Sequence, residues 1–278
     1  MKSAKIVSNL EAFALATVLA GSTLLSAKTP EQKAWDMLQA ATSSKNAQKR
    51  TQSVRALSLL RDDSRAVALA EKALRDQRAQ VRAAAATALG EMNSESSIPK
   101  LQHALNDKNT SVALAAARSL ADLQGSSAYG VYHAVLTGER KSGQGLLAGP
   151  QKMFSDPNKA AMFGLQAGLH FVPYAGIGFG VVKMMAQDHA SPVRASAAQA
   201  LANDPDPRSG QALAKAATDE KWVVRAAAVD AIARRGDPAL LKSIEPELSD
   251  GRREVRYTAA AAIIRLSSLA QSAHAAKS

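Results

Sequence analysis

The chain has 278 residues, of which 46% are hydrophobic and only 4% aromatic, and its formal net charge is +11. It is long enough to bury a large core, and the lack of cysteine excludes disulfides, lipid-modified cysteine and thiolate metal sites. Alanine recurs in runs, as at residues 83–86 and 259–262. Since alanine is the best helix former and lets helices approach closely, the composition predicts an all-α protein.

Residues 1–27 have the form of a signal peptide. A basic start with Lys2 and Lys5 precedes an uncharged apolar run over residues 12–25, and small residues follow at Ser26 and Ala27. This run is short for a membrane span. The sequence therefore predicts export to the periplasm or the cell exterior, with cleavage near Ala27. An uncleaved anchor and a cytosolic helix are the alternatives.

Residues 28–75 are predicted to form N-terminal capping helices and a shortened first repeat. A helix that opens at Thr29 and Pro30 carries Trp35 and Leu38 on one face. A hairpin follows, whose two helices have apolar residues at helical spacing: Val54, Leu57 and Leu60 in one, and Val67, Ala70 and Leu74 in the other. We expect this segment to close the N-terminal end of the array of repeats that comes next.

Five segments then share one pattern, in which an aspartate is followed five residues later by valine and then by small and apolar residues. They begin at Asp76, Asp107, Asp188, Asp219 and Asp250, and three of the intervals are 31 residues. In each segment the apolar positions fall on one helical face, and a second apolar helix follows. Each unit is therefore a helix hairpin that must stack on its neighbours to bury both faces.

The pattern D-x-x-x-x-V-R-x-A-A-x-x-A-L resembles HEAT repeats, in particular the short HEAT-like repeats of phycobilisome lyases. The resemblance extends from about Gln48 to the C-terminus. It implies an α-solenoid, a superhelix of stacked antiparallel helix hairpins, with about six to seven repeats. It also implies that the repeated arginines pair with aspartates of neighbouring repeats: Arg82, Arg194, Arg225 and Arg256. Ala113 replaces this arginine in one unit, which therefore lacks the pair.

The interval between Asp107 and Asp188 leaves room for one further repeat and an insertion. We expect repeats over 76–137, a glycine-rich insertion loop over 138–155, a degenerate hydrophobic repeat over 156–187, and repeats with a C-terminal cap over 188–278. Residues 163–182 are uncharged and contain five glycines. Besides a degenerate repeat, this stretch could form a hairpin that touches the membrane over residues 160–185, or a ligand pocket lined by the glycines.

No motif identifies an enzyme. The glycines of residues 138–145 lack the lysine of a phosphate-binding loop, and those of 176–180 lack the spacing and preceding strand of a dinucleotide site. The five histidines are isolated, and the His-Glu dipeptides of HEAT-like iron-dependent hydroxylases are absent. The repeat resemblance brings no lyase activity with it, because a repeat is an architecture. We expect no catalytic, cofactor-binding or metal-binding residues.

The middle of the chain is the predicted contact surface. Seven of the eleven aromatic residues lie between Tyr129 and Phe179, and residues 138–187 contain five basic and two acidic residues. The residues selected for partner binding are Tyr129, Tyr132, Arg140, Lys141 and Phe154. The two cations would steer an acidic partner.

The leading hypothesis is a non-catalytic exported α-solenoid scaffold that binds a protein partner, an acidic one by its charge. One alternative is an envelope protein that docks on the membrane surface through residues 160–185. A second is a HEAT-like enzyme or lyase-related protein. The export signal and the nearly neutral central repeats count against nucleic acid, and no small-molecule substrate is indicated.

Overall fold

The computed structural model describes residues 28–124 and 190–276, and every regular element in these residues is helical. The first part contains α1 (Pro30–Thr42), α2 (Ala47–Ala56), η1 (Leu57–Leu59), α3 (Ser64–Ala73), α4 (Ala79–Glu91), η2 (Glu95–Ser97), α5 (Ile98–Ala104) and α6 (Thr110–Gln124). The second contains α11 (Ala190–Ala200), η4 (Leu201–Asn203), α12 (Pro207–Ala216), α13 (Trp222–Arg235), η5 (Pro238–Leu240), α14 (Leu241–Ile244), η6 (Glu245–Ser249) and α15 (Arg253–Ala275). The all-α, solenoid prediction is confirmed.

Short polar side chains fix where several helices begin. Thr29 and Gln32 form a reciprocal capping box at α1, with Pro30 in the first turn. The side chains of Asn46, Asp63 and Asp206 accept backbone N–H groups at the starts of α2, α3 and α12. The helix that the sequence places at Thr29 and Pro30 is therefore present as predicted.

One layer of the array consists of helices that begin just after a repeat aspartate, and we call these the first-layer helices. They include α4, α13 and α15, which follow Asp76, Asp219 and Asp250. The helix α2 belongs to the same layer, because Ser44 takes the aspartate's place before it. The Ser44 hydroxyl accepts the N–H of Asn46 at 3.2 Å, as the Asp76 carboxylate accepts that of Arg78 at 2.8 Å.

The other layer consists of the second helices of the hairpins. Six residues before each aspartate, or before Ser44, these helices carry a side chain with no exposed surface: Leu38, Ala70, Leu101, Leu213 and Ile244. The shared register includes α1, whose Leu38 aligns with Leu101 of α5. Moreover, α1 packs on α2 as α3 packs on α4 and α5 on α6. By register and by packing, α1 is a second helix of a repeat.

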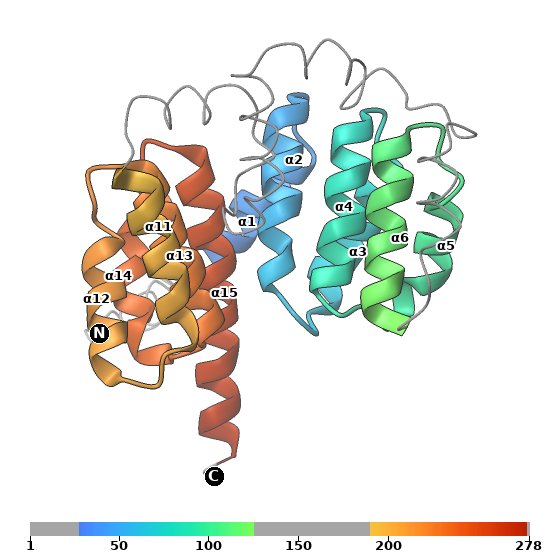
Figure 1. Cartoon of the computed structure of the whole chain (residues 1–278). Coiled ribbons are helices and arrows are strands. Elements are labelled where there is room, and N and C mark those ends of the chain that lie inside the picture. Colours follow the sequence, from blue (N-terminus) through green and yellow to red (C-terminus); the bar gives the residue numbers. More distant parts are fainter. Residues whose placement is uncertain (1–27, 125–189, 277–278) are drawn as a thin grey trace, which may run out of the picture.

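The spatial order of the first-layer helices differs from their order in the chain. They run α11, α13, α15, α2, α4 and α6, so that α15 lies beside α2 in the middle of the array (Figure 1). Next to them, α1 packs along α15. The Gln271 side chain, near the end of α15, donates to Glu31 at the start of α1 at 3.2 Å, as expected for an antiparallel pair. Thus α15 and α1 together make one repeat.

This arrangement differs from the caps that the sequence suggested for residues 28–75 and for the C-terminal segment. The free ends of the described array are α6 and α11, whereas α1, α2 and α15 lie inside it. The physical reason is burial. Trp35, Leu38 and Ala41 of α1 are buried and belong to the same hydrophobic core as Ile263 and Leu266 of α15. Periodicity gives the spacing of repeats but does not show which repeats are neighbours.

Small residues bring neighbouring first-layer helices close together. The Ser119 hydroxyl of α6 donates to the Ala86 carbonyl of α4 at 2.9 Å. A Cβ atom placed on Gly90 would lie 2.4 Å from that hydroxyl oxygen, so the contact requires glycine at this position. The alanine runs of α4 and α15 are likewise largely buried. Closely packed small side chains therefore form much of the core of this chain, which is 46% hydrophobic but has few large side chains.

Among the described helices, none has both the length and the apolar character needed to cross a bilayer. The uncharged stretch of residues 163–182 lies outside the described residues. So do the signal-like segment 1–27, the insertion 138–155 and the hydrophobic repeat expected over 156–187.

Candidate interaction surface

A series of arginine–aspartate pairs, which we call the Arg–Asp ladder, joins neighbouring repeats. In three pairs the arginine Nε and Nη2 atoms donate to the two carboxylate oxygens: Arg50–Asp76 at 2.6 and 2.8 Å, Arg82–Asp107 at 2.7 and 2.8 Å, and Arg225–Asp250 at 2.6 and 3.0 Å. Arg194 also pairs with Asp219. The pairs implied by the repeat resemblance for Arg82, Arg194 and Arg225 are therefore present.

The arginine of each of the three pairs with two hydrogen bonds also donates a hydrogen bond to a backbone carbonyl of its own repeat. The Nη1 atom of Arg82 donates to the Asp76 carbonyl at 2.8 Å, and that of Arg225 donates to the Asp219 carbonyl at 2.7 Å. Arg50 makes the same bond to the Ser44 carbonyl at 2.7 Å. The hydrogen-bonded Arg50 guanidinium lowers the pKa of Asp76. Sequence reasoning missed Arg50, because Lys49 and Ser44 replace the valine and aspartate that mark the other repeats.

Arg256 is the exception among the ladder arginines of the described residues. Its Nη1 donates to the Asp250 carbonyl at 2.5 Å, as in the other repeats. However, the repeat beside α15 is that of α2, where Ser44 replaces the aspartate. Within residues 28–124 and 190–276, no carboxylate lies in salt-bridge range of Arg256. The pair expected for Arg256 is thus not among the described contacts.

Two carboxylates, those of Asp250 and Glu247, lie beside the Arg225 guanidinium. Asp250 binds its Nε at 2.6 Å, and Glu247 of η6 lies 3.9 Å from the same atom. Burial raises the pKa of Glu247 to about 7, and the hydrogen bond with Asp250 adds to this shift. Glu247 therefore holds a proton more readily in the folded protein than in the unfolded chain.

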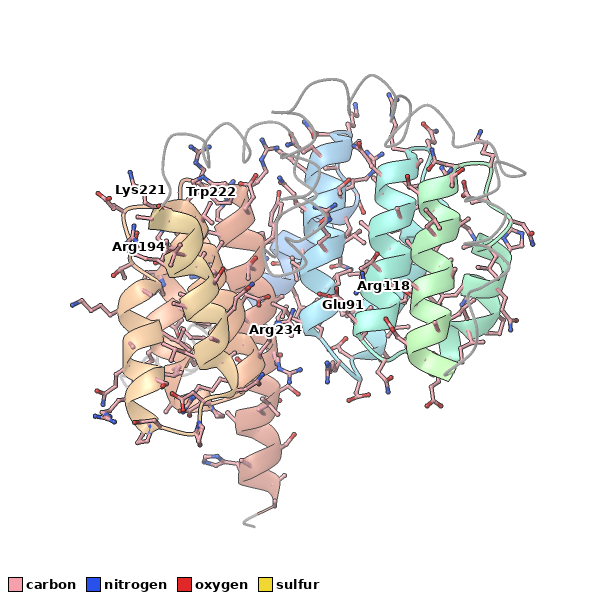
Figure 2. All side chains as sticks on the ribbon, in the orientation of Figure 1. Glu91, Arg118, Arg194, Lys221, Trp222 and Arg234 are labelled. Carbon is pink, nitrogen blue, oxygen red and sulfur yellow. The ribbon has the colours of Figure 1, made fainter. Side chains whose placement is uncertain are left out.

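A cluster of charged side chains lies where the C-terminal ends of the first-layer helices approach one another. Burial raises the pKa of Asp230, Arg234 opposes the shift, and the charge of Glu91 adds to it. Glu91 belongs to α4 and Asp230 to α13, which are separated in the array by α15 and α2, so the array is curved there. Figure 2 shows Glu91 and Arg234 near each other, in the middle of the view.

Arg265 of α15 fixes this curved region through backbone atoms. Its Nε donates to the Ala233 carbonyl of α13 at 2.9 Å, and its Nη1 donates to the Leu59 carbonyl of η1 at 3.1 Å. One side chain thereby joins both neighbours of α15. Burial lowers the pKa of Arg265, and the nearby charges of Arg61 and Arg234 act in the same direction.

The edge at which the first-layer helices begin is rich in exposed cations. We define the cationic edge as six exposed side chains: Lys45, Lys49, Arg78, Lys108, Lys221 and Arg252. Of these, Lys221 lies 3.7 Å from the exposed carboxylate of Glu220. The aspartates of this edge mostly face the ladder arginines, so their charge is balanced locally. Figure 2 shows Lys221 and Trp222 on this side of the molecule, and the Arg252 guanidinium lies 5.8 Å from the Trp222 ring centre.

The described residues contain surface depressions but no cluster of metal ligands. No group of three or more His, Asp or Glu side chains in residues 28–124 and 190–276 could hold a metal ion. Two depressions in this part of the chain lie beside α3 and α5, on the second layer. Glu71 and Lys100 line both of them, and His103 lines one. Lys100 binds Glu71 there at 2.5 Å, as an ordinary surface ion pair.

The five residues selected from the sequence for partner binding lie outside the described residues: Tyr129, Tyr132, Arg140, Lys141 and Phe154. The structure therefore neither brings them together nor separates them. It does show that residues 125–189 connect α6 to α11, which are the two ends of the described array.

The sequence profile of the HEAT repeats matches residues 67–129 and 180–267, which together exceed half of the chain. The chain belongs to the HEAT-repeat proteins. No curated protein sequence matches it. Membership in this family agrees with the hairpins, the layers and the Arg–Asp ladder described above.

Three solved structures are similar to the chain at low identity. Human deoxyhypusine hydroxylase in complex with glycerol is 19% identical, with a TM-score of 0.31 over 87% of this chain and 86% of that one. The CpcE–CpcF complex of the phycocyanin lyase from Nostoc is 22% identical, with a TM-score of 0.33 over 87% and 95%. An engineered protein is 16% identical, with a TM-score of 0.27 over 87% and 100%. These values are too low to bear on function.

Proposed function

We propose that this protein is a non-catalytic, exported HEAT-repeat scaffold that binds an acidic protein partner along the cationic edge. The observation that carries this proposal is the alignment of charge with architecture. Six exposed cations follow one edge across α2, α4, α6, α13 and α15, while the aspartates of the same edge are mostly occupied by arginines. A row of like charges attracts an oppositely charged partner and orients it before contact.

The architecture favours binding over catalysis. Stacked hairpins present a long surface, on which many modest contacts from several repeats add up. The described residues contain neither a cluster of metal ligands nor an enclosed pocket with converging polar groups.

The linking segment 125–189 extends this proposal. It joins the two ends of the array and contains Tyr129, Tyr132 and Phe154, which are aromatic anchors of the type that dominates binding energy. Arg140 and Lys141 add positive charge beside them. We assign the anchoring contacts to these five residues and the long-range attraction to the cationic edge.

Export is part of this proposal, and docking on the membrane surface is a second candidate. The N-terminal pattern of residues 1–27 supports export. The uncharged stretch 160–185 supports a second candidate, in which the protein docks on the envelope surface with help from the cationic edge. A high-salt wash of the membrane fraction separates the two, because it releases a protein held by a protein partner through charge and leaves one held by apolar insertion.

Capture of the partner by the tagged full-length protein tests the main proposal. We expect the triple variant K45Q/R78Q/K108Q to capture at least tenfold less partner at physiological salt, because each lost cation contributes about 0.5–1 kcal/mol of attraction. The matched control is K72Q/K215Q/K242Q, which removes the same charge from exposed positions on the second layer. A variant lacking residues 138–155 should also lose capture. If the two triple variants behave alike and the deletion has no effect, the proposal is wrong.

A further inference from the structure

We infer that the contact between α15 and α2, which we call the junction, contains a binding site for one carboxylate of the acidic protein partner, with Arg256 as the residue that binds it. This inference rests on the proposed partner-binding function and names the chemical group that one part of the surface recognises. It follows from comparing Arg256 with the arginines of the Arg–Asp ladder.

The ladder shows which ligand this arginine position accepts. In three repeats the Nη1 atom is fixed by a carbonyl of its own repeat, and Nε and Nη2 together hold an aspartate carboxylate at 2.6–3.0 Å. Arg256 is fixed in the same way, through Nη1 and the Asp250 carbonyl at 2.5 Å. Its other two donors therefore face the place that a carboxylate fills elsewhere.

At the junction, the neighbouring repeat supplies no acid to this place. Ser44 occupies the aspartate position, and its short neutral side chain accepts the N–H of Asn46 instead. The two nearest acids in sequence are already bound. Asp250 pairs with Arg225, and Glu254 accepts a hydrogen bond from Gln52 at 2.7 Å. No acid of the described residues lies in salt-bridge range of the two donors.

The surroundings favour an anion from outside the chain. Arg256 is only partly exposed, so its unpaired donors are incompletely solvated, and pairing them would give two charge-assisted hydrogen bonds. Lys45 adjoins Ser44, and Arg252 begins α15, so both belong to the cationic edge beside the junction.

The three ladder pairs point to a carboxylate as the ligand. Two parallel donors of a planar guanidinium match two oxygens of one carboxylate, as the three ladder pairs demonstrate in the same fold. An Asp or Glu side chain of the partner would thus complete the ladder between α15 and α2.

The test uses purified full-length protein and a fluorescein-labelled hexa-aspartate peptide, with binding followed by fluorescence anisotropy at low salt. We expect R256Q to weaken peptide binding about tenfold or more, since hydrogen bonds to charged groups are worth about 1.5–3 kcal/mol. The matched control K242Q, which removes an exposed cation from α14, should bind within about twofold of wild type.

The variant S44D makes the test independent of any folding defect in R256Q. It places an aspartate of the chain itself where the other repeats have one, so it should raise Tm and at the same time abolish most peptide binding. S44N, similar in size and uncharged, should keep both properties near wild type. A structural role of Arg256 alone would let S44D bind the peptide as well as wild type does, and that result would overturn the inference.

Competition identifies the ligand class. Acetate and free aspartate should displace the peptide from wild type more effectively than inorganic phosphate at equal ionic strength, and the reverse order would overturn the carboxylate assignment. The proposed function can fail separately. If K45Q/R78Q/K108Q and the 138–155 deletion capture partner normally while R256Q and S44D lose the peptide, the proposed surface is wrong and the junction site stands. If instead K45Q/R78Q/K108Q and the 138–155 deletion lose capture while R256Q and S44D bind the peptide normally, only the junction site is wrong.

Discussion

The α4–α6 contact and the α15–α2 junction are both contacts between neighbouring first-layer helices, but they are built differently. Between α4 and α6, Gly90 permits close approach to Ser119, and Arg82 binds Asp107 through two hydrogen bonds. At the junction the ladder pair is missing, and a Gln52–Glu254 hydrogen bond and the Arg265 bonds to backbone carbonyls connect the parts. The repeat signature thus stabilises contacts between consecutive repeats, whereas helix α1 and backbone contacts stabilise the junction.

The largest effect should come from the core of α1. We expect L38A to lower the free energy of unfolding by about 2–5 kcal/mol, the same range as L101A, because both leucines have no exposed surface and occupy one register. Urea denaturation of the two variants measures this. A cost below about 1 kcal/mol for L38A alone would show that α1 is a loose cap and not half of a repeat.

The ladder arginine Arg82 should contribute more to stability than Arg256 does. R82Q removes a pair that is largely shielded from water and takes the guanidinium away from the Asp107 carboxylate, so we expect a loss of about 2–3 kcal/mol. R256Q takes a guanidinium away from no carboxylate of the described residues. It should lower the free energy of unfolding by less than about 1 kcal/mol. Chemical denaturation at pH 7 compares them, and equal losses would mean that Arg256 has an internal partner.

The close approach of α4 and α6 can be tested by adding one methyl group. G90A places a Cβ atom 2.4 Å from the Ser119 hydroxyl and 2.6 Å from its Cβ, which should cost about 1–3 kcal/mol as one helix shifts. G251A is the control, because nothing lies within 4 Å of a Cβ there. Thermal melts should therefore separate the two variants, and similar Tm values would show that α4 and α6 are not tightly packed.

The last effect concerns pH. The pKa of Glu247 is raised to about 7 in the folded protein, so the folded state binds more protons than the unfolded state between about pH 4.5 and 7. Stability should therefore fall as the pH rises through this window.

E247Q isolates the contribution of Glu247 to the pH dependence of stability. The variant should remove that part of the pH dependence, whereas the contribution of Asp230, whose pKa is also raised, is common to both proteins and cancels. Denaturation of wild type and E247Q at pH 5 and pH 8 gives the difference. A difference that does not change with pH would exclude a shifted Glu247.

Much of the fold follows from the sequence, because the interactions that recur in space also recur in the chain. The aspartates at a fixed interval, with Arg82, Arg194 and Arg225 in register, predict the hairpins and three ladder pairs that the structure contains. The repeat of α2 is harder to recognise, since Ser44 and Lys49 replace its marker residues. Its buried positions, such as Val54 and Leu57, were nevertheless predicted from helical spacing and are buried.

The junction could not be predicted from one sequence. Each hairpin has an apolar surface that any other hairpin could cover, so periodicity does not distinguish a linear order from one in which α1 joins α15. The partner-binding residues proposed from the sequence rest on composition alone, and all five lie in the segment 125–189. Arg256 becomes notable only when its neighbour is known to be Ser44.

The repeat shared by α1 and α15 has a consequence for how the polypeptide acquires its structure. Gln52 and Glu254, which face each other at the junction, are 202 positions apart. Most repeat proteins can grow from one end by adding neighbours, but here the central pair forms only after nearly the whole chain has been synthesised, at the entropic cost of closing a very long loop. A nascent chain that still lacks α15 therefore exposes one flank of α1 and α2 to any chaperone or protease that it meets.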